Sequence, residues 1–494
     1  MSAYEQTSIV GAPVKLFSST SPAARAKPPR QRTAPEAPVE HGGQVRFAEM
    51  FVRQHAEHLR FVHGLGWYMW TGSHWRADEE RADMRAALAT IKGAIRGLAE
   101  LTGDDRDKLY KDIKKTETAS GIQGMLTIAG AIRPLSVASS MLDQDPYLFN
   151  TPAGTVNLRT GDLGPCDRAD LITKASGAPI GGEDGEPGRQ EWDTFIARIL
   201  PDEDVRAFVQ RLFGYAMLGK VTEHVMPIFT GTGANGKGTC RDAVMAAFGD
   251  YAIEVDPAIL MESKHERHGA FKMRLRGARL VFCSETEKGR RFAEATMKRL
   301  VGGDPIEANL MHKNPITFDP SHTLIMLTNH LPIVSGDDPA VWRRLFVVPF
   351  DVVIPEEERD PGLPDRLKSA PAAILAWVYQ GWLDYQSQGL NAPEVVRQRT
   401  AEYQQRSDVL SRFLAERTMT TSSYGTVAAR DLFTAWADWC RENREPIEAV
   451  GNENSFAESM ATRGFTKKRN NTGQVYRGLM LLSTEADPDE PEES

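Results

Sequence analysis

The stretch from Pro227 to Phe248 carries the residues of a phosphate-binding loop. Apolar residues that are typical of a buried strand lead into a glycine-rich segment of the form G-x-x-x-x-G-K, and a helix-forming segment follows from Cys240. Glycines let backbone N–H groups converge on phosphate oxygens at a helix N-terminus, and the lysine reaches the β- and γ-phosphates. We therefore predict an ATP site that is formed by Gly231, Thr232, Gly233, Ala234, Asn235, Gly236, Lys237, Gly238 and Thr239.

The residue after the lysine departs from the usual pattern. Gly238 stands where a serine or threonine hydroxyl commonly holds Mg²⁺, so we expect Thr239 to supply that hydroxyl. The G-K-G-T form also occurs in nucleoside monophosphate kinases. A small-molecule phosphotransferase therefore remains an alternative at this point.

Three further segments could complete the chemistry of phosphate transfer. Arg279–Cys283 is an apolar run that ends in acids, among which Glu285 is placed to bind Mg²⁺ and the attacking water, with Glu287 close behind. A second apolar run ends at Asn329, whose amide could orient water. Arg343 and Arg344 precede a third apolar run, and an arginine there could neutralise transition-state charge.

The elements that must position these residues alternate between strands and helices from Met226 to Phe350, a pattern that predicts a parallel α/β core. The chain has 494 residues, 26% of them charged and 41% hydrophobic, so it has room for several domains of roughly 150 residues. Its four cysteines form no C-x-x-C pair, which excludes a disulfide framework or a zinc spacing. We find no apolar run of about 18 residues and no signal peptide, and expect a cytoplasmic protein without membrane contact.

Five segments in fixed order carry a resemblance to a known family. GTGANGKGT, RLVFCSETEKG, MKRLVGGDPIEANLMHKNPITF, TLIMLTNHLP and WRRLFVVPF resemble the superfamily 3 helicases of the AAA+ class, in the branch of phage and plasmid primase–helicases. The resemblance covers about residues 50–483. It implies an ATP- and Mg²⁺-dependent DNA helicase that works as a ring, a hexamer in this family, with Lys237, Glu285, Asn329 and the trans-acting Arg344 as its functional residues. The second acid of the family's carboxylate pair falls near Thr286, which leaves the role of Glu287 open.

The resemblance also fixes the expected fold class: an α/β P-loop NTPase core with a mainly helical N-terminal domain and a small winged-helix C-terminal domain. The expected order is a disordered tail at 1–44, a helicase-associated domain at 45–176, a linker at 177–189, the ATPase domain at 190–355 with a helical lead-in at 190–220, a helical connector at 365–405, a winged-helix-like unit at 406–483 and an acidic tail at 484–494.

Two basic hairpins are the candidate DNA contacts. In superfamily 3 rings a hairpin projects into the channel, and here its tip would carry His312 and Lys313. The terminal hairpin places four cations around Tyr476, a composition that suits phosphate contacts without sequence preference: Lys467, Lys468, Arg469 and Arg477. The formal net charge of −8 does not oppose this, because six acids lie in the last eleven residues.

Two other functions remain open. A replication initiator or DNA-binding scaffold with weak ATPase activity is favoured if Gly238 prevents Mg²⁺ binding. Intrinsic primase activity needs paired metal-binding carboxylates, and the candidate D-x-D pair in the N-terminal half is Asp143 and Asp145. A separate primase or polymerase is the partner expected otherwise.

Overall fold

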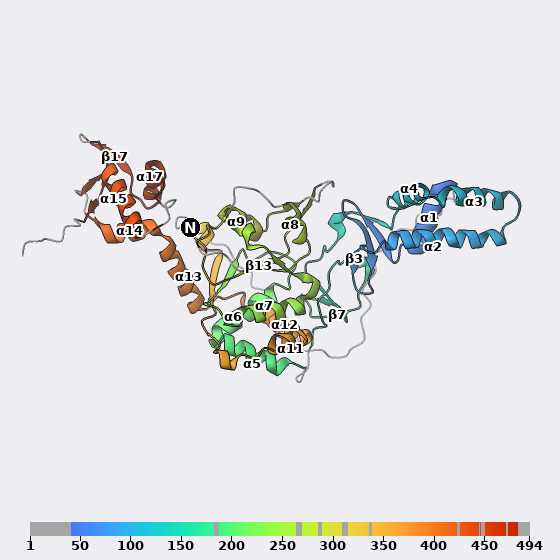
Figure 1. The fold of residues 1–494 in the computed structure, drawn as a ribbon, viewed down its shortest axis with the longest axis horizontal. Helices are drawn as coiled ribbons and strands as arrows, with labels where there is room; N and C mark the ends of the chain where they lie inside the picture. Colours follow the sequence, from blue (N-terminus) through green and yellow to red (C-terminus); the bar gives the residue numbers. More distant parts are fainter. Residues whose placement is uncertain are drawn as a thin grey trace, which may run out of the picture.

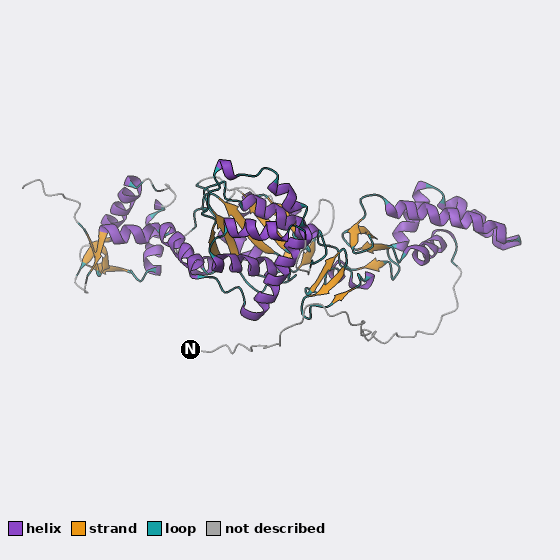
Figure 2. Ribbon diagram, turned by 90° about the horizontal axis from the view of Figure 1, so that it is seen from below, coloured by secondary structure: helices purple, strands orange, loops and turns teal. Residues whose placement is uncertain are grey.

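A computed structural model describes residues 41–181, 187–262, 269–284, 289–308, 315–334, 338–421, 425–443, 445, 450–470 and 473–482. Within these ranges the chain forms three units that lie in a row in both ribbon views (Figures 1 and 2). The expected N-terminal tail lies outside the described residues up to residue 40, and the expected acidic tail from residue 484 lies outside them as well. No helix in the described ranges has both the length and the apolar composition that a bilayer crossing needs.

The N-terminal unit packs helices against one face of a small sheet. Phe47 and Phe51 lie four residues apart on the first helix and are both fully buried, because this spacing puts them on one helical face. The helices are α1 (Gly43–His55), α2 (Ala82–Gly97), α3 (Gly103–Thr116) and α4 (Ala119–Ala129). The sheet has the order β3-β2-β1-β4, with β1 (Leu59–Val62), β2 (Gly66–Trp70), β3 (Trp75–Ala77) and β4 (Ser136–Val137).

A second, three-stranded antiparallel sheet follows in the chain and contains β5 (Leu148–Thr151), β6 (Gly154–Asn157) and β7 (Leu163–Gly164). Its tight turn depends on Gly154, which has a φ of +145°, and a Cβ there would lie 2.3 Å from the Gly164 carbonyl oxygen.

The central unit is built on a five-stranded parallel sheet with the order β14-β8-β13-β10-β9. Its strands are β8 (Met226–Thr230), β9 (Ala252–Val255), β10 (Leu280–Ser284), β13 (Thr323–Thr328) and β14 (Leu345–Pro349). The inner strands are almost continuously apolar, because helices cover both faces (Figure 2). The expected parallel α/β core is therefore present. Because all five strands run the same way, their carboxyl ends share one edge.

One face of the sheet packs on α5 (Arg189–Ile199), α6 (Glu203–Tyr215), α7 (Lys237–Phe248), α11 (Leu363–Lys368) and α12 (Pro371–Gln388). Helices α6 and α12 approach closely at Gly214 and Gly381, where added Cβ atoms would lie 2.1 Å and 2.0 Å from the facing backbone. The other face carries α9 (Glu294–Val301), α10 (Pro339–Trp342) and α13 (Glu394–Ser407), and α8 (Gly269–Arg274) precedes β10 in the chain. Most of the segment 365–405, expected as a connector, thus packs into the central unit.

The C-terminal unit has a hydrophobic core of its own around Phe413, Trp436, Trp439 and Tyr476. Its helices are α14 (Val409–Arg417), α15 (Ala429–Glu442) and α17 (Glu453–Thr462). Its antiparallel strands are β15 (Thr418–Thr420), β16 (Thr426–Ala428), β17 (Lys467–Asn470), β18 (Gly473–Arg477) and β19 (Leu479–Leu481), paired as β16-β18-β17 and β15-β19. Helix α13 leads into this unit from the central one (Figure 1).

Candidate nucleotide site and DNA-facing surfaces

The glycine-rich segment forms a loop between the carboxyl end of β8 and the first turn of α7. Its backbone has positive φ angles at Gly233 (+102°), Ala234 (+49°) and Gly236 (+78°), which turn the chain sharply into the helix. Among the described residues, no N–H group of the range 231–236 donates a hydrogen bond to the protein. Unpaired N–H groups at a helix N-terminus are the donors that a phosphate group requires, so this loop fits a triphosphate.

Three contacts join the loop to the surrounding protein. The buried Asn235 amide donates to the Phe350 carbonyl (3.1 Å), and the Ile354 N–H donates to the Ala234 carbonyl (2.8 Å). Gly236 faces α5, where a Cβ would lie 2.5 Å from the Ile199 side chain. The segment after β14 and helix α5 therefore fix the shape of the loop.

Lys237 and Asn329 meet at the carboxyl edge of the sheet. The Lys237 ammonium donates to the Asn329 side-chain oxygen (3.2 Å) and to the Gly231 carbonyl (3.1 Å). They meet although 92 residues separate them, because β13 lies directly beside β8. An amide and an ammonium group at this edge can contact a phosphate group and a water molecule together.

The residues expected at the metal are only partly described. Gly238 is exposed, and a Cβ there would meet nothing within 4 Å, whereas Thr239 is half-buried one residue further along α7. Glu285 and Glu287 lie outside the described residues, although Ser284 ends β10 at the same edge. The chemistry of the predicted donors, a hydroxyl and a carboxylate, suits Mg²⁺.

Arg241 belongs to this edge and was missed in the sequence. It lies one turn after Lys237 on α7, and its guanidinium donates to the Glu254 carboxylate (2.8 Å) and to the Ser284 hydroxyl (2.9 Å). It therefore ties α7 to the ends of β9 and β10. It also pairs with the neighbouring Asp242 (2.8 Å), and no local pattern separates such an arginine from a solvated one, since Glu254 and Ser284 are distant in sequence.

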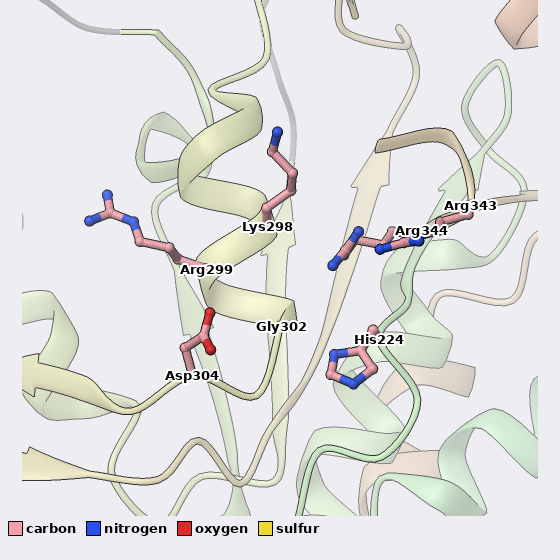
Figure 3. A pocket seen from close by; sticks show the side chains of 7 residues that line it. All are labelled: His224, Lys298, Arg299, Gly302, Asp304, Arg343 and Arg344. Atoms are coloured by element: carbon pink, nitrogen blue, oxygen red, sulfur yellow. The ribbon is translucent and has the colours of Figure 1, made fainter. Parts of the chain in front are cut away.

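Arg343 and Arg344 lie at the opposite edge of the sheet. They precede β14, and the Met226 N–H donates to the Arg344 carbonyl (2.6 Å) at the amino end of β8. The two arginines, with His224 and the end of α9, line a cavity of about 470 Å³ (Figure 3). Arg344 also donates to the Ala340 carbonyl (2.6 Å), while its buried Nε has no partner in the described part of the chain. The arginine pair is thus separated from the glycine-rich loop of the same chain by the length of β14.

The other wall of this cavity is also basic. Lys298 and Arg299 extend from α9, opposite Arg344 and His224 (Figure 3). The Lys298 ammonium bonds to the Asp338 carboxylate (2.7 Å), and this bond holds the pKa of that carboxyl below its usual range. The remaining cations of the lining outnumber its single acid, Asp304, so the cavity favours an anion.

The two predicted DNA-binding hairpins differ in how much of them is described. Strands β11 (Ile306–Ala308) and β12 (Ile316–Phe318) pair in antiparallel fashion and form the base of the first, while its tip with His312 and Lys313 lies outside the described residues. The second hairpin is β17–β18. Its cations are Lys467, Lys468, Arg469 and Arg477. None of them forms an ion pair with a described acid, and all are exposed except Lys467, which is half-buried.

The acidic pair in the N-terminal half has structural partners. Asp143 accepts hydrogen bonds from the Thr173 N–H (2.7 Å) and hydroxyl (2.6 Å), and Asp145 pairs with Arg159 (3.2 Å). No group of three or more His, Cys, Asp or Glu side chains in the described ranges is arranged to hold a metal ion. These carboxylates therefore lend no support to a primase centre.

Similarities to known proteins agree with this arrangement. Residues 48–201 match the family described as D5 N terminal like, and residues 229–344 match a family of unknown function, DUF5906. The chain is 26% identical over 325 residues to a putative helicase of Acanthamoeba polyphaga mimivirus, covering 61% of this chain and 34% of the relative. It is 25% identical over 269 residues to a putative primase of African swine fever virus, covering 50% of this chain and 28% of the relative.

The chain spans about a third of the length of these curated relatives, at 34% and 28%. A solved structure of the NrS-1 C terminal region aligns with 62% of this chain and 78% of its own, at 12% identity and a TM-score of 0.39, a likeness too low to inform the function. Together, the sequence matches make the chain similar to proteins named as helicases and primases of viral replication.

Proposed function

We propose that the chain is an ATP-dependent DNA helicase of superfamily 3, which forms a ring, hexameric by its resemblance, in the replication of a phage, plasmid or integrated mobile element. The observation that carries this proposal is the pairing of Lys237 with Asn329 beside a loop of unpaired N–H groups. A lysine, a polar amide and backbone donors at one sheet edge are what hydrolysis of a γ-phosphate needs.

The residues of this edge would divide the chemistry between them. The loop N–H groups and Lys237 would bind the phosphates, and Asn329 would orient the attacking water. Thr239 and Glu285 would hold Mg²⁺, which supplies charge neutralisation at the phosphates when bound, and Glu285 would also accept the proton of the water.

Arg344 would serve a neighbouring subunit. Strand β14 has five residues and spans roughly 15 Å, so the arginine cannot reach the loop that follows β8 in its own chain. In a closed ring the amino edge of one subunit can face the carboxyl edge of the next, because a heterologous contact repeats head to tail. The cavity around Arg344 is the surface that would meet the neighbour's triphosphate.

DNA would be held at two places. The exposed cations of β17–β18 suit contacts with backbone phosphates that do not depend on base sequence, and the tip with His312 and Lys313 would grip the translocating strand. In this proposal a separate primase or polymerase is the partner that makes new strands.

An ATPase assay with and without single-stranded DNA tests the proposal. DNA-stimulated hydrolysis is expected of a helicase, DNA binding without hydrolysis of a scaffold, and phosphate transfer to a nucleoside monophosphate without DNA stimulation of a kinase. Incorporation of nucleotides on a single-stranded template would instead indicate intrinsic primase activity.

The Lys237→Ala variant ties the activity to the site. It should abolish hydrolysis and leave the melting temperature nearly unchanged, because the lysine is a point charge on phosphate rather than part of the hydrophobic core. Lys111→Ala, on the exposed side of α3, is the matched control and should retain full activity. A folded Lys237→Ala protein that hydrolyses ATP at the native rate would remove the assignment.

A further inference from the structure

The helix that begins at the phosphate loop is held at its other end by the N-terminal unit. Helix α7 ends at Phe248, and the carbonyl groups of its last turn lack partners within the helix. One of them, at Ala247, accepts a hydrogen bond from the Gly177 N–H (3.0 Å). Just beyond the helix, the Asp250 N–H donates to the Ala175 carbonyl (2.9 Å), and the Asp250 carboxylate accepts from the Ala175 N–H (3.3 Å).

Two glycines let the backbones touch at this point. A Cβ on Gly177 would lie 1.9 Å from the Ala246 carbonyl oxygen, and a Cβ on Gly249 would lie 2.5 Å from the Gly177 nitrogen. Gly249 also has a φ of +55°, a conformation that other residues rarely adopt. Neither position tolerates a side chain without a shift of the backbone.

Tyr251 makes a second connection, three residues after α7. Its hydroxyl accepts a hydrogen bond from the Asn150 N–H on β5 (3.1 Å), and its ring stacks on Phe149 with centroids 4.7 Å apart. Tyr251 is 1% exposed, and burial raises the pKa of its hydroxyl to about 12, so the neutral hydroxyl remains in place at physiological pH. Asn150 is fully buried as well.

The segment that touches α7 is anchored both to the four-stranded sheet of the N-terminal unit and to the β5–β7 sheet, whose Phe149 and Val156 pack into the core of the central unit. The Ile172 carbonyl accepts from the Trp75 N–H on β3 (2.8 Å), and the Ser176 N–H donates to the Asn150 carbonyl (2.9 Å). The Asn150 amide donates in turn to the carbonyls of Ser73 (3.0 Å) and Lys174 (3.2 Å). The end of α7, the segment 172–177 and the strands β3 and β5 are therefore one hydrogen-bonded body.

We propose that the N-terminal unit positions Lys237 through α7, and that Tyr251 and Gly177 are the positioning residues that carry this coupling. The inference rests on the proposed ATPase function. It goes beyond that function because it makes the helicase-associated unit part of the hydrolysis machinery rather than a separate DNA-binding or assembly module.

A helix of 12 residues is about 18 Å long and nearly rigid, so a displacement of its carboxyl end reaches its first turn, where Lys237 lies. Misplacing a catalytic group by about 1 Å can lower the rate by roughly a hundredfold. In the other direction, a nucleotide that orders the loop and α7 also restrains the segment 172–177 and Asn150.

Tyr251→Phe is the most conservative test, because it removes one hydroxyl and keeps the stacked ring. In the full-length chain we expect kcat for ATP to fall roughly fivefold, within the range that a shift below 1 Å produces, while KM for ATP changes less than twofold. Tyr385→Phe removes a comparable hydroxyl, which bonds to Glu223 (3.0 Å) on a different part of the core, and should leave kcat unchanged.

Hydrogen exchange separates positioning from general destabilisation. In the wild-type chain, ATP with Mg²⁺ should slow exchange both at the loop amides and at the amides of Asn150 and Gly177. In Tyr251→Phe the loop should still be protected, but the protection at Asn150 and Gly177 should shrink. Gly177→Ala should act in the same direction and more strongly if it folds.

The outcomes are distinct. Protection of the loop without any change at Asn150 and Gly177, or a native kcat in Tyr251→Phe, would overturn the inference and leave the ATPase proposal standing. No protection of the loop by ATP would instead refute the ATPase proposal, and the inference would fall with it.

Discussion

Replacing Arg344 with alanine should separate what one subunit can do from what a ring can do. The Arg344 guanidinium lies at the amino edge of the sheet, beyond the five residues of β14 from the phosphate loop. Nucleotide binding to the variant should be native, because the loop and Lys237 are untouched. Hydrolysis should fail only where a neighbour's arginine is needed.

The magnitude follows from the distance. At roughly 15 Å in water, a unit charge acts on another with about 0.3 kcal/mol before screening by salt, so loss of Arg344 should lower the rate of an isolated subunit less than about twofold. An arginine that contacts the transferring phosphoryl group contributes about a thousandfold or more, which corresponds to about 4 kcal/mol. The assembled ring should therefore lose about a thousandfold in kcat.

The assay compares hydrolysis at concentrations below and above assembly, and then mixes variants. Arg344→Ala and Lys237→Ala proteins should each be inactive, yet their mixture should recover part of the activity, because an intact loop on one subunit can meet an intact arginine on the next. Arg343→Ala is the neighbouring control and should be affected less, since the exposed Arg343 guanidinium makes no hydrogen bond or ion pair with a described residue that would hold it in the cavity.

Two results would refute this reasoning. One is an equal loss of activity in the isolated Arg344→Ala subunit and in the assembled protein. The other is a mixture that forms normal rings with exchanged subunits and recovers nothing.

Three further outcomes are expected. Thr239→Ala should weaken Mg²⁺-dependent turnover more than Gly238→Ser does, because Gly238 faces open space. If Thr239→Ala leaves turnover unchanged throughout a Mg²⁺ titration, carboxylates and water alone hold the metal. Lys313→Ala should uncouple hydrolysis from unwinding. A triple alanine variant of the β17–β18 hairpin at Lys467, Lys468 and Arg469 should instead weaken DNA binding and reduce its salt dependence by roughly one unit per lost phosphate contact, and equal effects of both changes in both assays would remove the distinction. Burial lowers the pKa of His322 to about 4 from its ordinary 6.5, so the unfolded chain binds the proton more tightly than the folded chain. The free energy of unfolding, measured by urea titration, should therefore fall by about 2 kcal/mol between pH 6.5 and pH 5, and the His322→Leu variant should lack this part of the loss.

Local features of the candidate nucleotide site could be predicted from the sequence. The glycine-rich loop was recognisable because glycines, a lysine and flanking apolar residues impose their conformation over a few residues. The strands that end at Ser284 and Thr328 were recognisable as apolar runs, since a strand that is buried on both faces needs apolar side chains almost throughout. The hairpin at β17–β18 followed from its turn-forming residues in the same way.

The order of the strands was decided only by the tertiary structure. Nothing local to Asn329 indicates that β13 lies between β8 and β10, yet this order brings its amide to 3.2 Å from Lys237. The same order places Arg344 at the opposite edge, and the fold brings Arg241 to Ser284. Strand order depends on which distant faces pack together, and a sequence pattern reports only which residues are buried.

The connections between units were likewise hidden in the sequence. Helix α12 is apolar enough to be recognised as buried, but only the fold shows that Gly381 seats it against α6 in the central unit. Gly177 belongs to a stretch whose composition predicts a linker, and instead it contacts the end of α7. A glycine-rich composition indicates backbone freedom, and whether that freedom serves a flexible linker or a close contact between two backbones is settled by what packs beside it.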